Sequence, residues 1–181
     1  AFSDLSVLGD FETNEDYMPF LHSVMQGNTP NTISGYLNVS VLGGNTANTE
    51  FEFLTGNTMA FLPQGSVAYQ QYVKHNDYSL ATYFKEQGYD TIAMHPYNAS
   101  GWDRDKVYPL LGFDTFYSLK DWVNPHKIRK YVSDKSCYDK IIELYEQKDK
   151  NTPFFIFNVT MQNHSSYSEE YDNFHPDITV E

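Results

Sequence analysis

Helical and strand patterns alternate along this chain, and this alternation limits the fold more than any other feature. Helical patterns are found in residues 13–27, in the first part of 79–95 and in 134–150. Runs rich in β-branched, aromatic or apolar residues are found in 32–42, at the end of 79–95 and in 154–164. Strands that alternate with helices are typical of βαβ units, which place the strands parallel. The sequence therefore predicts an α/β fold, a three-layer α/β/α sandwich with a mainly parallel sheet.

Short signals place the ends of these elements. In residues 13–27, Thr13 or Asn14 is expected to cap the helix and Gly27 to end it. Another helix is expected from about Ala47, and the strand pattern in 79–95 ends at His95. The apolar run in 154–164 is typical of a central strand.

Composition limits the partners that the chain can have. Of its 181 residues, 24 are acidic and 12 basic, which gives a formal net charge of −12. Dispersed cations do not supply the clustered basic surface that phosphate backbones need, so we expect no nucleic-acid partner. An anionic substrate would need a local basic pocket or a metal ion. Cys137 is the only cysteine, which excludes an internal disulfide and a thiolate zinc cluster.

Polar residues gather where the expected strands end. The segments "GGNT", "HPYNASGWDR" and "MQNHSSY" follow three strand patterns. In open α/β sheets, ligands bind outside the carboxyl ends of the strands. These three segments are therefore the first candidates for a site.

Thr46 follows two glycines and precedes a helical pattern. Its hydroxyl would lie beside free backbone N–H groups that favour a phosphate or sulfate, and as a nucleophile it would need a base or a metal ion. The alternative is that Asn45 or Thr46 only caps the helix. Thr49, one turn later, is a rival hydroxyl that is expected to pack or to bond to the backbone.

One loop carries three further candidates. His95 offers a proton donor, Trp102 a flat apolar wall and Arg104 a bidentate fork for phosphate. Each also has an ordinary explanation: a histidine bonded to backbone, a tryptophan that closes the core, an arginine paired with a neighbouring aspartate. His164 is a second imidazole at a strand end, and alone it would be read as a structural histidine.

The order of these motifs resembles the extracellular catalytic domain of the lipoteichoic acid synthase family, phosphoglycerol transferases of the alkaline phosphatase and sulfatase superfamily. The resemblance covers nearly the whole chain and is carried by "AFSDL", "GGNTANTEFEFLTG", "FLPQGS", "ATYFKEQGYDTIAMHPYNASGWDRDKVYPLLGFDTFY" and "PFFIFNVTMQNHSSY". It implies an alkaline phosphatase/sulfatase-like sandwich. It also implies that Thr46, and not Thr49, is the nucleophile, and that the substrate pocket contains His95, Trp102, Arg104 and His164.

The resemblance implies a mechanism as well. A divalent metal ion, Mn²⁺ or Mg²⁺, binds the Thr46 oxygen, which attacks the phosphorus of a phosphatidylglycerol-like lipid. Diacylglycerol leaves, and a glycolipid or a growing glycerol phosphate polymer displaces the threonine. The parent protein is expected at the extracellular face of a bacterial cell membrane, held by an anchor outside residues 1–181.

The chain departs from the family at its metal site. Besides the threonine, the family uses a glutamate, which here would directly precede Ala1, and a downstream Asp-His pair that does not occur before Glu181. We therefore expect residues 1–181 to be a single, partial, truncated sulfatase-like catalytic domain that is inactive alone. A truncated sheet is also expected to expose apolar edge surface, so the fragment is expected to self-associate. Tyr97 stands where some relatives carry an acidic pocket residue.

Three alternative functions remain open. One is another phosphotransferase or phosphodiesterase of the same superfamily. A second is a sulfatase-like hydrolase, disfavoured because Cys137 lacks the C/S-x-P-x-R context that formylglycine formation needs. The third is a non-catalytic module that binds cell-wall anions.

Overall fold

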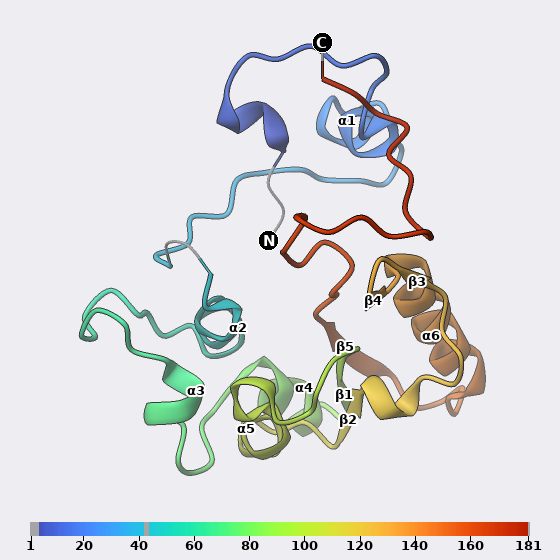
Figure 1. The fold of residues 1–181 in the computed structure, drawn as a ribbon. Helices are drawn as coiled ribbons and strands as arrows, with labels where there is room; N and C mark the ends of the chain where they lie inside the picture. Colours follow the sequence, from blue (N-terminus) through green and yellow to red (C-terminus); the bar gives the residue numbers. More distant parts are fainter. Residues whose placement is uncertain (1–3, 42–43, 181) are drawn as a thin grey trace. The chain divides into compact units, whose positions relative to one another are not determined.

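The structure is a computed structural model that describes residues 4–41 and 44–180. The chain divides into two compact units (Figure 1). One unit is formed by the described residues up to Val39 together with those from Phe174 onward, and the other by Ser40–Asn173. None of the helices in the described residues combines the length and the apolar character needed to cross a bilayer.

The first unit contains the 3₁₀ helix η1 (Leu5–Leu8) and the short helix α1 (Pro19–Met25). The prediction that this helix is capped at Thr13 or Asn14 is wrong. Thr13 instead forms an isolated bridge with Val180, and Asn14 donates its backbone N–H to a carbonyl of the C-terminal segment. Proline also disfavours helical geometry in the residue before it, so the helix begins at Pro19.

The prediction of a strand in residues 32–42 is also wrong for its described part, 32–41. This segment has no regular secondary structure, and Ile33 and Tyr36 are fully exposed. β-branched and aromatic residues favour a strand only when a neighbouring strand and a buried face reward it. Leu42 lies outside the described residues.

A three-stranded parallel sheet organises the second unit. Its strand order is β2 (Thr115–Ser118), β1 (Asp90–His95) and β5 (Phe154–Asn158), and both pairings are parallel. The predicted α/β fold with a parallel sheet is confirmed. The central strand is β1, however, and β5 lies at an edge of this sheet, in contrast to the expectation for residues 154–164.

Helices cover both faces of the sheet. Neighbouring strand residues point to opposite faces, and in β5 Phe154 contacts Tyr145 of α6 (Asp134–Gln147) whereas Phe155 stacks on Phe84 of α4 (Leu80–Glu86). Phe157, on the same face as Phe155, packs against Tyr108 of α5 (Arg104–Leu110). Figure 1 shows α4 and α5 beside the strands, and the second unit is therefore a three-layer arrangement.

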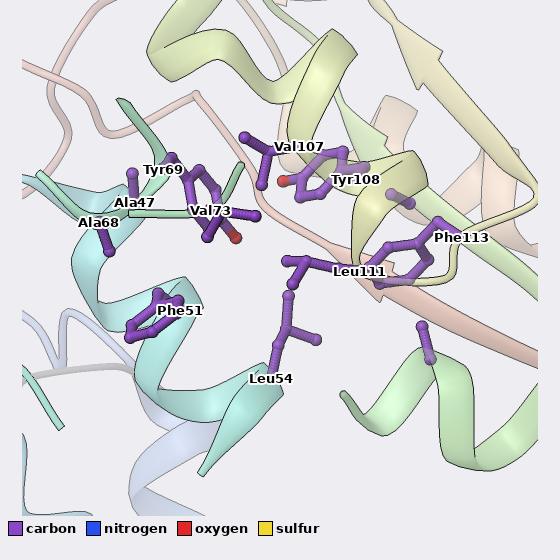
Figure 2. Packing of buried hydrophobic residues seen from close by; sticks show 12 residues of the cluster. Ala47, Phe51, Leu54, Ala68, Tyr69, Val73, Val107, Tyr108, Leu111 and Phe113 are labelled. Carbon is purple, nitrogen blue, oxygen red and sulfur yellow. The ribbon is translucent and has the colours of Figure 1, made fainter. Parts of the chain in front are cut away.

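The main apolar core lies between α5, the helix α2 (Thr46–Thr55) and the segment around α3 (Ala68–Gln71) (Figure 2). Ala47, Phe51 and Leu54 all come from α2, and they pack with Tyr69, Val73, Tyr108 and Leu111. Full burial of a large apolar side chain contributes roughly 1.5–3 kcal/mol. This packing fixes the start of α2, where Thr46 lies, relative to the start of α5, where Arg104 lies.

The remaining elements are short. They are the 3₁₀ helices η2 (Gly101–Asp103) and η3 (Leu119–Asp121) and the antiparallel hairpin of β3 (Lys127–Ile128) and β4 (Tyr131–Val132).

Candidate active site

His95 is the last residue of β1, so it lies at the carboxyl edge of the sheet. Its side chain is buried, and Nδ1 lies 2.9 Å from the carbonyl oxygen of Val159, the residue after β5. A carbonyl only accepts, so Nδ1 carries the proton and Nε2 is the free acceptor. Burial, together with the charge of Arg104, lowers the pKa of His95 from 6.5 to about 4. The imidazole is therefore neutral at pH 7.

The loop after β1 contains two non-glycine residues in left-handed backbone geometry. Trp102 has φ 58° and Asp103 has φ 57°, and these values bring the chain directly into α5 at Arg104. Such geometry costs on the order of 1–2 kcal/mol per residue and often occurs at functional sites. The Trp102 side chain is partly buried against the main core, so it also has the packing role that a tryptophan at the edge of a core commonly has.

Arg104 is buried and forms a bidentate ion pair with Glu50 of α2. A third N–H group of Arg104 donates to the carbonyl of Gly101 at 3.2 Å. Tyr108 donates its hydroxyl to the same Glu50 carboxylate at 2.9 Å. The expected alternative partners, Asp103 and Asp105, do not take this role: Asp103 pairs with Lys106 instead. Glu50 thus holds the guanidinium group on the side of α5 that faces α2.

Thr46 is the first residue of α2, and its side chain is exposed. Asn45 occupies the N-cap position in left-handed geometry, with φ 50°, and makes no side-chain cap hydrogen bond. Among the described residues, no side chain is found to accept a hydrogen bond from the N–H groups of this first turn. Thr46 precedes Glu50 by four residues, so the two side chains lie on the same face of the helix, ~6 Å apart along its axis. Thr49, three residues after Thr46, is half-buried. Gly43, the first glycine of "GGNT", lies outside the described residues.

His164 lies in the exposed loop after β5. Its Nδ1 is 2.8 Å from the carbonyl oxygen of Ser165 and 3.3 Å from the hydroxyl of Tyr131. By the same argument as for His95, Nδ1 carries the proton and Nε2 is the acceptor.

The structure brings the imidazoles and the guanidinium group together. Tyr97 packs against His95 and Tyr131, and Tyr131 packs edge-on against His164. Arg104 Nη1 and the Tyr97 ring both lie beside Gly101, and the charge of Arg104 contributes to the lowered pKa of His95. Thr46 is linked to this group by Glu50, which lies one turn further along α2 and forms the ion pair with Arg104.

Sequence reasoning missed three residues that support this arrangement. Glu50 holds Arg104, Tyr131 contacts His164, and Arg129 binds the loop that carries His164. Only Glu50 had a signal in the sequence, because it follows Thr46 by one helical turn. Arg129 and Tyr131 come from a hairpin that no pattern indicated.

The described residues do not form a complete metal site. No group of three or more His, Cys, Asp or Glu side chains gathers among residues 4–41 and 44–180 in a way that could hold an ion. Thr46 offers a single exposed oxygen. A divalent ion at this position needs further ligands.

Three comparisons relate this chain to known proteins. Residues 8–178 match the family model described as Sulfatase. The chain is 38% identical over 167 residues to the "Putative cyclic beta-1,2-glucan modification protein" of Rhizobium meliloti (strain 1021), a match that covers 92% of this chain and 25% of that protein. It is 30% identical over 157 residues to the lipoteichoic acid synthase of Staphylococcus saprophyticus, covering 85% of this chain and 24% of that protein. The chain thus spans about a quarter of the length of these curated relatives.

Solved structures agree with the fold. The Streptococcus pyogenes phosphoglycerol transferase GacH, in complex with sn-glycerol-1-phosphate, matches with a TM-score of 0.76 and 30% identity over 99% of this chain and 46% of that chain. The lipoteichoic acid synthase LtaP from Listeria monocytogenes matches with a TM-score of 0.57 and 22% identity, over 70% of this chain and 30% of that chain.

Proposed function

Because the chain belongs to the sulfatase family, in the lipoteichoic acid synthase-like part of the alkaline phosphatase superfamily, we propose that it is part of the catalytic domain of a phosphoglycerol transferase. The observation that carries this proposal is the exposed Thr46 hydroxyl. It lies at the start of α2, which has no side-chain cap, one helical turn before Glu50, the residue that binds Arg104. The similarity to GacH, whose structure contains sn-glycerol-1-phosphate, supports a glycerol phosphate substrate.

Thr46 is the proposed nucleophile. Its Oγ forms a bond to the phosphorus of a phosphatidylglycerol-like lipid while the bond from phosphorus to the diacylglycerol oxygen breaks. The hydroxyl proton passes to Nε2 of an imidazole, His95 or His164, and from there to the leaving oxygen. In the second step an acceptor hydroxyl takes the phosphoryl group and its proton returns to Thr46 by the same route.

Arg104 is proposed to bind the phosphate. Guanidinium has five N–H groups, and three of them are bonded to Glu50 and Gly101. The two that remain, one on each terminal nitrogen, form a pair that suits two phosphate oxygens. The first turn of α2 adds N–H groups without a side-chain cap, and Trp102 is proposed to pack against the glycerol.

A divalent metal ion, Mn²⁺ or Mg²⁺, is the proposed cofactor. When bound, it would supply the positive charge that lets the threonine hydroxyl ionise near neutral pH. Thr46 is the only ligand proposed in this chain, and the others are proposed to come from outside residues 1–181. The parent protein is proposed to act at the extracellular face of a bacterial membrane, where its lipid donor is found.

The acceptor is proposed to be a glycolipid, a glycerol phosphate polymer or a glucan. The first two follow from the lipoteichoic acid synthases, at 30% identity for the S. saprophyticus protein. The glucan follows from the R. meliloti relative, which at 38% is more similar to this chain. A formylglycine sulfatase is disfavoured: Cys137 is fully buried in α6, and burial raises the pKa of its thiol to about 12.

The first prediction concerns Thr46. In the full-length protein with Mn²⁺ and a fluorescent phosphatidylglycerol, Thr46→Ala should reduce diacylglycerol release by at least ~10³-fold, because it removes the attacking oxygen. Thr46→Ser keeps an oxygen and should retain measurable turnover. Thr49→Ala, on the same helix, is the matched control and should release diacylglycerol at close to the wild-type rate.

Unchanged turnover in Thr46→Ala would overturn the assignment of the nucleophile. If neither phosphatidylglycerol nor phosphatidylethanolamine is cleaved but glycerol phosphate binds, and Arg104→Ala abolishes that binding, the module that only binds anions is the better description.

A further inference from the structure

Arg129 is an unusual arginine in the tight turn between β3 and β4. Its backbone has φ 55°, in the left-handed region that glycine and asparagine adopt at lower cost. Its side chain nevertheless folds inward, and the residue is only 5% exposed. A left-handed, buried arginine where glycine would be easier indicates that the side chain has a specific task.

The guanidinium group of Arg129 binds one loop by its backbone. Nη1 donates to the carbonyl of Ser166 at 2.8 Å, and Nη2 donates to the carbonyls of Gln162 at 2.7 Å and His164 at 3.0 Å. The guanidinium carbon also lies 3.9 Å from the ring centre of Tyr167, in cation–π geometry. All four partners belong to the segment 162–167.

Within the described part of the chain, no carboxylate pairs with this charge. None of the ion pairs formed within residues 4–41 and 44–180 includes Arg129. A buried guanidinium stays protonated, so its desolvation must be offset by the carbonyls and the tyrosine ring. The loop therefore cannot move away without leaving a buried charge unpaired.

The same hairpin fixes the imidazole itself. Tyr131, two residues after Arg129, donates its hydroxyl to the carbonyl of Ser165 at 3.0 Å. That carbonyl is also the acceptor for Nδ1 of His164. Arg129 and Tyr131 together thus bind four carbonyls of the segment 162–166, and the carbonyl of Ser165 sets the His164 tautomer.

We propose that Arg129 is a positioning residue that holds the 162–166 backbone so that His164 keeps its proton on Nδ1 and presents Nε2 as acceptor. The role for His164 in proton transfer rests on the proposed function, whereas the effect on the imidazole does not. Lysine cannot replace this arginine fully, because an ammonium group lacks the planar fork that reaches separate carbonyls at once.

The direct test is the ring nitrogen spectrum of His164. In the full-length protein labelled with ¹⁵N-histidine, with His164→Gln used to assign the signals, the wild type should show a protonated Nδ1 and an unprotonated Nε2. Arg129→Ala should lose this pattern and give the averaged shifts of an imidazole that exchanges between tautomers. Lys127→Ala, which removes a positive charge from the same hairpin, should keep the wild-type pattern.

A second readout separates positioning from a general loss of structure. In diacylglycerol release, Arg129→Ala should lower kcat by roughly 10²-fold with little change in KM, the loss that a displaced catalytic group produces. Combined with His164→Ala, it should cause almost no further loss, because both changes remove the same step. Arg129→Lys should fall between Arg129→Ala and the wild type, and it replaces Arg129→Ala if that variant does not fold.

The outcomes distinguish the two proposals. An unchanged His164 nitrogen spectrum in Arg129→Ala, or in Arg129→Lys where only that variant folds, would overturn the positioning role. If the kcat losses of Arg129→Ala and His164→Ala multiply when the two changes are combined, the positioning role is overturned as well. Absence of donor cleavage by the wild type would instead count against the proposed function, and the nitrogen spectrum would still decide the role of Arg129.

Discussion

Two imidazoles of this chain share one hydrogen-bonding arrangement. His95 and His164 each place Nδ1 within 2.9 Å of a backbone carbonyl, which leaves Nε2 as the nitrogen available for chemistry. They differ in environment, because His95 is buried beside the Arg104–Glu50 pair whereas His164 is exposed. The charge state of His95 is therefore controlled by the protein interior, and that control has a consequence for stability.

The stability of the second unit should fall as the pH drops below 6.5, in part because of His95. Its pKa is lowered from 6.5 to about 4 in the folded state, by burial first and by Arg104 second. Between these values the unfolded chain binds a proton that the folded chain excludes, so acid favours unfolding. The full contribution is present above pH 6.5 and amounts to roughly 3 kcal/mol relative to pH 4.

His95→Asn tests this point, because the amide keeps a donor near the carbonyl of Val159 but does not titrate. Urea unfolding of wild type and variant at about pH 7 and pH 5 measures the difference. The wild type should lose more free energy of unfolding than the variant over this range. Equal losses would show that His95 is not held neutral by the fold.

Sequence reasoning identified the chemical groups of the site but not what holds them. Thr46, His95, Trp102, Arg104 and His164 were selected by motif and resemblance, and their catalytic and binding roles stay predictions. Glu50, Arg129 and Tyr131 were missed because their importance comes from contacts between residues far apart in the chain, such as Arg104 with Glu50. A left-handed arginine that binds carbonyls leaves no pattern in a single sequence.

Elements with local signals were predicted well. The helix expected in the first part of 79–95 is α4, where Ser79 accepts hydrogen bonds from the N–H groups of Ala81 and Thr82 and Gly88 follows the helix with φ 83°. α6 and β1 were also found close to their expected bounds. The strand prediction for 32–41 was wrong because strand formation depends on a partner strand. The predicted start of α1 was wrong because Thr13, an expected cap, pairs with the C-terminal segment instead.

The turn between α5 and β2 packs against α4 so closely that only glycine fits. A Cβ at Gly112 would lie 2.6 Å from Oγ1 and 2.9 Å from the backbone nitrogen of Thr82, and its φ of 93° is itself unfavourable for other residues. Gly112→Ala should therefore destabilise the unit by about 1–2 kcal/mol for the backbone, with a further 1–3 kcal/mol or so for the overlap.

Gly88→Ala is the matched control for Gly112→Ala. Gly88 has a similar φ of 83°, but a Cβ there meets nothing within 4 Å. Only the backbone cost of about 1–2 kcal/mol is expected. Chemical denaturation of both variants gives the comparison, and equal destabilisation would mean that α4 and the turn are not in the close contact described.

At the scale of the whole molecule, the described residues supply only part of what the proposed reaction needs. The chain spans about a quarter of the length of its curated relatives. Its described residues gather a candidate nucleophile, two imidazoles and an arginine, but no cluster of metal ligands. That residues 1–181 form a partial single catalytic domain, and that the fragment self-associates through exposed sheet edges, stay predictions.

We expect the isolated 181-residue chain to be inactive even with saturating Mn²⁺ or Mg²⁺. A threonine hydroxyl that is not held by a multidentate metal site remains protonated at neutral pH, and one oxygen ligand does not retain a divalent ion against water. Diacylglycerol release from fluorescent phosphatidylglycerol should stay at the background rate for residues 1–181, while the full-length protein turns over under the same conditions. Circular dichroism of the fragment checks that it is folded. Metal-dependent cleavage by the folded fragment, lost in Thr46→Ala, would mean that these residues complete a metal site among themselves.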